Sequence, residues 1–262
     1  MAVHLISLAF SAYLIYLSAP GTDLFSWHPT CMAVAFILLS LQAIVLFSPE
    51  STLFPTTPRA DKVQLHWILN TFGVASAAFG FFSIYVNKEL NQRKHFVSWH
   101  AKFGLATFVS VWCVVLGGVV AKYNQTFKRW ARPVNLKLYH ATAGMLVFTL
   151  AMATIMLACY SNWFKNRVKG WAWRVAFGCP LVLAVCVMRQ VTQNYMDKIL
   201  VEKESEADVK AKKVQARIEE KLKKDLAKQK LKKKTLESPK ATPIVAEEIN
   251  PVYGSNFDKK SL

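Results

Sequence analysis

Long apolar stretches separated by short polar breaks dominate the first 196 residues. Six of them are long enough to cross a bilayer, which takes about 20 mostly apolar residues within a range of roughly 17 to 25. They are Val3–Ala19, His28–Phe47, His66–Val86, Ser98–Ala121, Leu138–Tyr160 and Trp171–Val191. The pattern predicts an all-α fold, a bundle of six transmembrane helices.

The breaks between these stretches carry turn residues, such as Pro20-Gly21 and Pro55 with Pro58. The first stretch starts almost at Met1, lacks a basic leader and ends in a poor cleavage site, so we expect a helix there and not a signal peptide. Tryptophans mark several stretch ends, where amphipathic rings favour the membrane interface. They are Trp27, Trp67, Trp99, Trp163 and Trp171.

Beyond residue 196 the pattern changes to a highly charged tail, which predicts two parts, 1–196 and 197–262. We expect a helix over about 199–234 and disorder after Pro239. Its apolar stripe is thin, which is typical of a solvated or weakly self-associating helix. The basic half of the tail could also rest on anionic lipid. The stripe consists of Val214, Ile218, Leu222 and Leu226.

Composition agrees with a membrane protein. Of 262 residues, 53% are hydrophobic and only 19% are charged, against about a quarter in soluble proteins. The tail holds 17 Lys and Arg with 12 Asp and Glu, which leaves 16 and 4 for residues 1–196. These figures argue against a soluble enzyme, a disulfide-rich secreted module and a disordered chain. None of the five cysteines has C-x-x-C spacing, so neither a zinc site nor a disulfide framework is indicated.

An even number of spans puts both ends of the chain on one face of the membrane, which we call side A. Basic residues in the loops are nearly balanced between side A and the opposite side B. Lysines just after the last stretch tip the balance, and the positive-inside rule then makes side A cytoplasmic. These are Lys198, Lys203, Lys210, Lys212 and Lys213.

Four histidines lie at or just inside the first turn of a predicted span: His28, His66, His100 and His140. The second and fourth helices enter from side B, and the third and fifth enter from side A. The histidines therefore sort into a side-B pair, His28 with His100, and a side-A pair, His66 with His140. Two facing imidazoles are what six-coordinate haem iron requires, and a four-helix core (helices 2–5) can present them inward.

The alternative for any single histidine at a span end is an interfacial residue with a satisfied hydrogen bond, and we assign His4 and His95 to that class. Glycines on the same helices would give a flat macrocycle room or let helices approach closely. These are Gly73, Gly80, Gly104, Gly117, Gly118 and Gly144.

Four segments, taken together and in order, resemble the cytochrome b561 family of two-haem transmembrane reductases. They are 24–29 (LFSWHP), 47–51 (FSPES), 66–67 (HW) and 137–142 (KLYHAT). The resemblance covers essentially residues 1–196. The charged tail is not part of it, so it implies nothing about the tail's function.

The resemblance implies two haem b groups, held by His66 with His140 towards the cytoplasm and by His28 with His100 towards the lumen or exterior. Family members take single electrons from cytosolic ascorbate and deliver them to monodehydroascorbate or ferric iron. The family also suggests a homodimer. We expect an integral multi-pass protein of an endomembrane, the endoplasmic reticulum or a vesicle, with both termini cytoplasmic and no nucleic-acid partner.

Cations near the histidines are candidates for binding anions. Lys62 lies four residues before His66 and Lys137 three before His140, which places each amine on its histidine's helix face if the helix extends that far. Both are candidate ascorbate-binding residues. Lys102 and Arg174, on side B, are candidate partners for haem propionates. The alternative for all four is snorkelling to the lipid headgroups.

Two other functions remain open at this stage. One is a proton or divalent-metal transporter that uses the histidines as relay or ligands, although the predicted spans contain no Asp or Glu to help hold a metal. The other is a non-catalytic membrane scaffold whose charged tail recruits partners.

Overall fold

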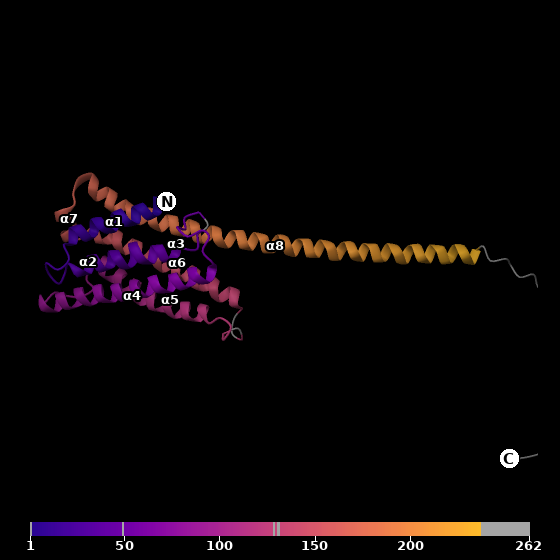
Figure 1. The fold of residues 1–262 in the computed structure, drawn as a ribbon, viewed down its shortest axis with the longest axis horizontal. Coiled ribbons are helices and arrows are strands. Elements are labelled where there is room, and N and C mark those ends of the chain that lie inside the picture. Colours follow the sequence, from indigo (N-terminus) through magenta and orange to yellow (C-terminus); the bar gives the residue numbers. More distant parts are fainter. Residues whose placement is uncertain (1, 49, 128, 130–131, 237–262) are drawn as a thin grey trace, which may run out of the picture. The chain divides into compact units, whose positions relative to one another are not determined.

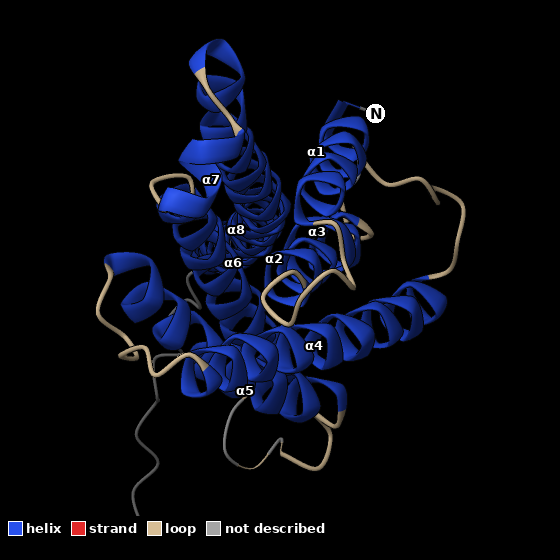
Figure 2. Ribbon diagram, turned by 90° about the vertical axis from the view of Figure 1, so that its left-hand side faces the viewer, coloured by secondary structure: helices blue, strands red, loops and turns tan. Residues whose placement is uncertain are grey.

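The structure is a computed structural model that describes residues 2–48, 50–127, 129 and 132–236. All regular structure in these ranges is helical, as Figure 2 shows, which confirms the all-α expectation. In chain order (Figure 1) the elements are α1 (Ala2–Ser18), α2 (Trp27–Met32), η1 (Ala33–Ser40), α3 (Leu41–Val45), α4 (Arg59–Leu90), α5 (Trp99–Lys122), α6 (Pro133–Ala158), α7 (Asn162–Arg167) and α8 (Gly170–Leu236).

Five helical segments of the described chain are long and apolar enough to cross a membrane. They are Trp27–Val45, Arg59–Leu90, Trp99–Lys122, Pro133–Ala158 and Gly170–Gln193. The sixth expected span corresponds to α1, which is apolar but has 17 residues, at the short end of what a bilayer needs. A helical membrane bundle is therefore the architecture, and the chain is an integral membrane protein.

Two helices begin earlier than hydropathy predicts. Helix α4 starts at Arg59, after the extended residue Pro58, and α6 starts with Pro133 at its first position, where proline's missing N–H costs no helical bond. The expectation that His66 and His140 lie in a first turn is wrong. Both lie about two turns into their helices, because hydropathy detects only the apolar part and α4 and α6 continue beyond it.

The second span is one continuous helix built from α2, η1 and α3, and η1 is π-helical. It is the most deeply buried helix of the bundle, with Ile37 and Leu41 fully buried. Small residues let α4 pack closely against it. A Cβ on Gly80 would lie 2.8 Å from the Cβ of Cys31, and one on Gly73 would lie 3.3 Å from the Ala35 carbonyl oxygen.

The hydrophobic core joins α1, the second span, α6 and α8 through residues such as Phe148, Met152 and Leu183. Helices α4 and α5 instead carry large apolar side chains on their outer faces. Phe82 is 68% exposed and Leu116 is 67% exposed. In a bilayer such faces contact lipid, which is as apolar as the side chains themselves.

Helix α8 contains Pro180 and continues without a break from the last span to Leu236, so no new helix starts near residue 199. The chain divides into two compact units, 1–202 and 203–262. In the second unit the expected apolar stripe is exposed, at Val214, Ile218, Leu222 and Leu226. The segment expected to be disordered after Pro239 lies outside the described residues.

Candidate functional site

The structure brings the four span histidines together in the two pairs expected from helix direction. In the side-B pair, the rings of His28 on α2 and His100 on α5 have centroids 6.1 Å apart and planes at 79°. In the side-A pair, His66 on α4 and His140 on α6 have centroids 6.1 Å apart and planes at 84°. Each pair thus joins two different helices with nearly perpendicular rings.

Main-chain carbonyl groups of neighbouring helices hold three of the four rings through Nδ1. A carbonyl oxygen can only accept, so Nδ1 of each of these rings carries the proton and Nε2 keeps its lone pair. A histidine in this tautomer can bind a metal through the Nε2 lone pair. The bonds join His28 to Gly80 at 3.0 Å, His66 to Ala43 at 2.9 Å and His100 to Thr154 at 2.9 Å.

The fourth ring, His140, is held more loosely. Its Nδ1 is buried without a regular hydrogen bond, although the Val114 carbonyl on α5 is near enough to act on the ring as an acceptor. The backbone of α5 also passes close to the ring, since a Cβ on Gly118 would lie 3.0 Å from His140 Cε1. Val114 and Gly118 therefore form the wall that positions this imidazole.

Each of the four core helices serves both sites, with a histidine for one pair and, further along, a carbonyl for a histidine of the other. On α4, α5 and α6 the same number of residues separates the histidine from the residue that provides the carbonyl. This separation is just under four turns of an α-helix, so the histidine and the carbonyl lie on the same helix face, about 21 Å apart along the axis. The spacing runs from His66 to Gly80 on α4, from His100 to Val114 on α5 and from His140 to Thr154 on α6.

The second span differs, because the separation of His28 from Ala43 is longer by a single position. In a regular α-helix the extra residue would turn the Ala43 carbonyl by about 100° away from that face. The π-helical stretch Ala33–Ser40 lies between them, and its wider turns absorb the additional residue. The second span thereby reaches both sites like the other three.

The spacing of the rings fits a haem iron between them. A metal–imidazole bond is about 2.0 Å and the nitrogen lies about 1.2 Å from its ring centre, so two imidazoles that bound one metal ion from opposite sides would have centroids about 6.4 Å apart. Both observed spacings are 6.1 Å. Among the described residues no group of three or more His, Cys, Asp or Glu could hold a bare metal ion. Two protein ligands at each site would suit a haem iron, because the porphyrin would supply the other four ligands.

The segment that contains the four histidines matches a known protein family. The sequence profile of a family described as eukaryotic cytochrome b561 matches residues 27–165, a range that includes all four histidines. The chain belongs to the eukaryotic cytochrome b561 family. Proteins of this cytochrome b561 family bind haem b.

Its similarity to single proteins extends over most of the chain. The mouse protein named probable transmembrane reductase CYB561D1 is 40% identical over 199 residues, which is 76% of this chain and 86% of that protein. Its human counterpart is 38% identical, over 74% of this chain and 85% of that protein. The bovine transmembrane reductase CYB561D2 is 35% identical, over 74% and 87%.

On side A, an aromatic ring and an amide lie next to His66, and a cation lies beyond the aromatic ring. The Phe47 ring lies 5.3 Å from the His66 ring, and the Arg59 guanidinium lies 5.6 Å from the centre of the Phe47 ring. The Asn70 amide nitrogen lies 3.3 Å from His66 Nε2, the nitrogen that a metal would take. Sequence reasoning missed Asn70, although its place one turn after His66 on the same face could have indicated it.

The two side-A lysines named from the sequence both lie within helices. Because α4 begins at Arg59 and α6 at Pro133, Lys62 and Lys137 share their histidines' helix faces, as the spacing requires. Lys62 is half-buried and Lys137 is exposed.

On side B the two named cations lie at the surface. The Lys102 amine lies 5.1 Å from the centre of the Trp99 ring, and both residues are exposed, which is the arrangement of a lysine that snorkels to the interface. Arg174 is also exposed. A different cation, Lys88, is close enough to act electrostatically on both His28 and His100.

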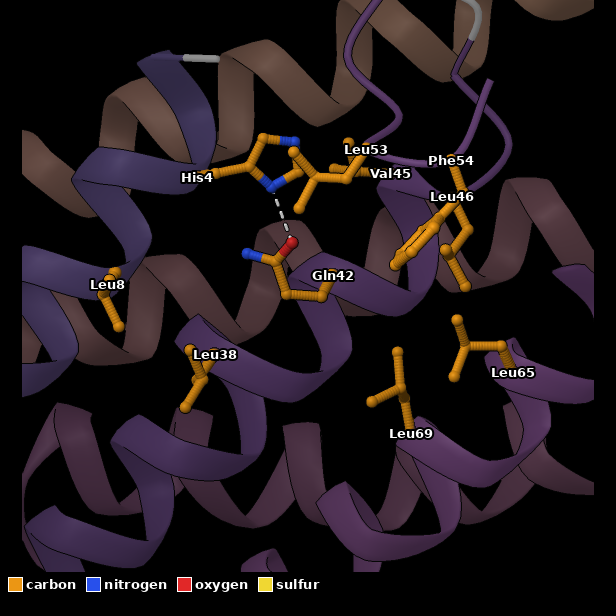
Figure 3. Close-up of a pocket in the computed structure, with 10 residues that line it drawn as sticks. All are labelled: His4, Leu8, Leu38, Gln42, Val45, Leu46, Leu53, Phe54, Leu65 and Leu69. Atoms are coloured by element: carbon orange, nitrogen blue, oxygen red, sulfur yellow. Dashed lines mark hydrogen bonds between the residues drawn. The ribbon is translucent and has the colours of Figure 1, made fainter. Parts of the chain in front are cut away.

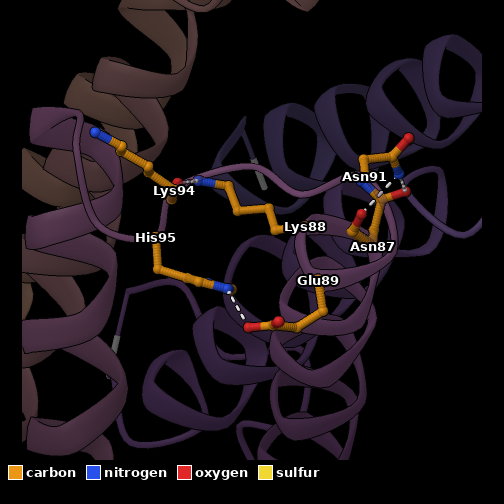
Figure 4. A network of polar contacts seen from close by, with 6 residues as sticks. All are labelled: Asn87, Lys88, Glu89, Asn91, Lys94 and His95. Atoms are coloured by element: carbon orange, nitrogen blue, oxygen red, sulfur yellow. Dashed lines mark hydrogen bonds and ion pairs between the residues drawn. The ribbon is translucent and has the colours of Figure 1, made fainter.

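Lys88 belongs to a polar network at the junction of α4 and the following loop (Figure 4). Its amine donates to the Lys94 carbonyl at 3.0 Å, and His95 Nε2 lies 2.8 Å from a Glu89 carboxylate oxygen. The His95 ring also stacks on Tyr85, with centroids 4.5 Å apart. His95 is therefore engaged in the loop and not in either histidine pair.

Proposed function

We propose that the protein is a transmembrane one-electron reductase that holds two b-type haems, one at each histidine pair. Its donor is cytosolic ascorbate at side A, and its acceptor is monodehydroascorbate or ferric iron at the luminal or exterior side B. Membership of the cytochrome b561 family and the reductase names of relatives support this function.

The observation that carries the proposal is the pair geometry. In each pair the centroids of two nearly perpendicular imidazole rings from different helices lie 6.1 Å apart, and three of the four rings have Nδ1 bonded to a carbonyl. A bound haem supplies an iron that takes up and releases single electrons at fixed positions in the membrane. The chain's own part is to fix the ring tautomers and to keep the two sites about 21 Å apart along rigid helices.

Cations near the side-A pair suit an anionic donor. Arg59, Lys62 and Lys137 lie on helices that enter from this side, and Lys122 lies at the end of α5 that reaches it. A cleft lined by one sign of charge raises the local concentration of an oppositely charged substrate. In this proposal Lys62 and Lys137 contact ascorbate. The Lys122 amine lies 4.7 Å from the Trp67 ring centre and contributes to the field.

The pair geometry argues against a transporter for a bare metal ion. Such a site needs three or more protein ligands, and carboxylates suit most divalent cations. Asp61 and Glu89 are the acidic residues of α4, and both lie near its ends. Neither histidine pair has a third ligating side chain among the described residues.

For the membrane orientation, we propose that side A faces the cytosol, with both termini there, and that the protein resides in an endomembrane. The lysines that follow the last span support this orientation. Protease protection of a terminal tag in sealed microsomes tests it, and a protected carboxyl terminus would reverse the assignment of donor and acceptor sides.

A reduced-minus-oxidised spectrum of the purified protein, with haem quantified against protein, tests the function. We expect a b-type α band and two haems per chain. His66→Ala and His100→Ala should each lower the ratio to about one, because each removes one ligand of a different pair. His4→Ala, which lies outside both pairs, should keep two. A ratio of one in the unmodified protein, or no ascorbate-reducible band, would contradict the proposal.

A further inference from the structure

A groove of 380 Å³ opens between α1 and α4, with η1 and α3 forming its floor and the loop that follows α3 closing one end (Figure 3). Eight of its ten lining residues are apolar, and the other two are His4 and Gln42. No Lys or Arg is among the described residues that line it. The volume falls within the range of small-molecule sites, roughly 300 to 1,000 Å³.

The polar end of the groove offers one free hydrogen-bonding group. His4 Nδ1 lies 2.6 Å from the Gln42 carboxamide oxygen, and His4 Nε2 bonds to the Ser51 carbonyl. A neutral imidazole has one N–H, so this chain of bonds needs either a protonated ring or a Gln42 carboxamide turned end for end. In both arrangements no described residue pairs with the other end of the carboxamide, which points to the side of the groove lined by Leu8 and Leu38 (Figure 3).

The groove lies directly behind the side-A pair. Leu65 immediately precedes His66, and Leu69 lies about one turn after His66 on α4. On the floor, Val45 and Leu46 precede Phe47, whose ring is 5.3 Å from the His66 ring. One helix wall therefore separates a ligand in this groove from His66.

We propose that the groove binds a lipid-soluble quinone. Its ring would lie among the leucines and Phe54, and its hydrocarbon tail would leave towards lipid. With the carboxamide oxygen bonded to His4, the free end of Gln42 is the amide N–H, which donates to a quinone carbonyl. With the carboxamide turned end for end, the free end is the oxygen, which accepts from a quinol hydroxyl.

A phospholipid fits the same groove poorly. Its phosphate would need a cationic partner, which the described lining lacks, and its two chains exceed the space for one small ligand. The choice of a redox-active ring over an inert amphiphile rests on the proposed haem site at His66. Binding of a ligand in the groove does not depend on that haem site, so the inference about the groove and the proposed function can fail separately.

Photolabelling of the full chain in phosphatidylcholine nanodiscs tests the inference, with a photoreactive benzoquinone carrying a ten-carbon tail as the probe. We expect saturable labelling of peptides from α1, α3 and α4, displaced by unlabelled decyl-benzoquinone. Leu69→Trp fills the groove and should weaken binding about tenfold or more, and Gln42→Leu about threefold or more. The matched control is Leu116→Trp on the exposed face of α5, which should bind normally.

Several outcomes overturn the inference. Equal displacement by lysophosphatidylcholine would identify an unspecific lipid groove, and labelling unaffected by Leu69→Trp would place the probe elsewhere. If Leu69→Trp fails to elute as a monodisperse protein, Leu38→Trp fills the groove from its floor and is held to the same result. Haem is quantified in the same samples. Binding without haem would contradict the proposed function alone, and haem without binding would contradict this inference alone.

Discussion

A histidine that binds a metal must keep one ring nitrogen free of protons, and at three of the four rings a carbonyl of a neighbouring helix does this. His28, His66 and His100 each use Nδ1 for such a bond. His140 depends instead on close packing by α5 and on the Val114 carbonyl. The side-A pair therefore contains the ring that is most sensitive to its packing neighbours.

This difference predicts the effect of one methyl group. Gly118→Ala would place a Cβ 3.0 Å from His140 Cε1, so the ring or α5 must move. We expect loss of the side-A haem and a fall in unfolding free energy of about 1 to 3 kcal/mol, as for other overpacked sites. Haem content and thermal unfolding measure both effects.

The control for this substitution is Gly144→Ala, whose Cβ would meet Val114 Cγ1 at an ordinary 3.9 Å. It should keep both haems and gain up to about 1 kcal/mol from helix propensity. Equal haem loss in the two variants would show that the ring contact is not the cause.

The side-A lysines make a second prediction at this scale. Lys62→Gln with Lys137→Gln removes two cations from the proposed donor site, so the KM for ascorbate should rise about three- to tenfold with little change in kcat. The effect should shrink at high ionic strength, because salt screens exposed charges. Lys102→Gln, on side B, is the control, and an equal rise in KM there would refute a local donor site.

At the scale of elements, the two sites are built from one repeated arrangement. A histidine and a carbonyl acceptor are separated by the same distance in sequence on α4, α5 and α6, and by a single position more on the second span. The wider turns of the π-helical stretch absorb the additional residue, so His28 and the Ala43 carbonyl still lie on one helix face. Such a stretch costs regular hydrogen-bond geometry, which the deep burial of this helix offsets.

Shortening the π-helical stretch by a single position tests its role. Deleting Val34 lets η1 close into a regular α-helix and gives His28 and Ala43 the spacing found on the other three helices, so both groups stay on one face. We expect two haems to be retained. Deleting Val109 from α5, which is α-helical throughout, turns His100 about 100° away from Val114 and should remove one haem. If both deletions lose haem equally, the π-helical stretch does not compensate for the additional residue in the second span.

At the scale of the whole molecule, the membrane unit 1–202 contains all four histidines and the groove, and the charged unit 203–262 contains none of them. A chain that ends at Glu202 should therefore keep two haems and ascorbate-driven electron transfer. The haem spectrum and transmembrane reduction in proteoliposomes measure this. Loss of haem on truncation would show that the tail stabilises the membrane unit, which favours a structural role for it.

Hydropathy and helix direction predicted much of this molecule. Apolar runs predicted the bundle, because a bilayer imposes a length and a polarity on every span. Because successive spans run in opposite directions, the sequence predicted that His28 and His100 share one membrane face and that His66 and His140 share the other. The same signal misplaced the starts of α4 and α6, since a helix can continue into polar sequence where hydropathy no longer marks it.

The sequence by itself therefore determined the class of protein, the helical nature of its spans and the histidines that share a membrane face, because these depend on the bilayer and on chain direction. Only the tertiary structure decided the ring spacing of 6.1 Å, the carbonyls that hold three of the four imidazoles, the nearness of Asn70 to His66 and the π-helical stretch. These depend on distances between helices and on the turn of each helix. Packing across the bundle sets both, and no local pattern of residues encodes them.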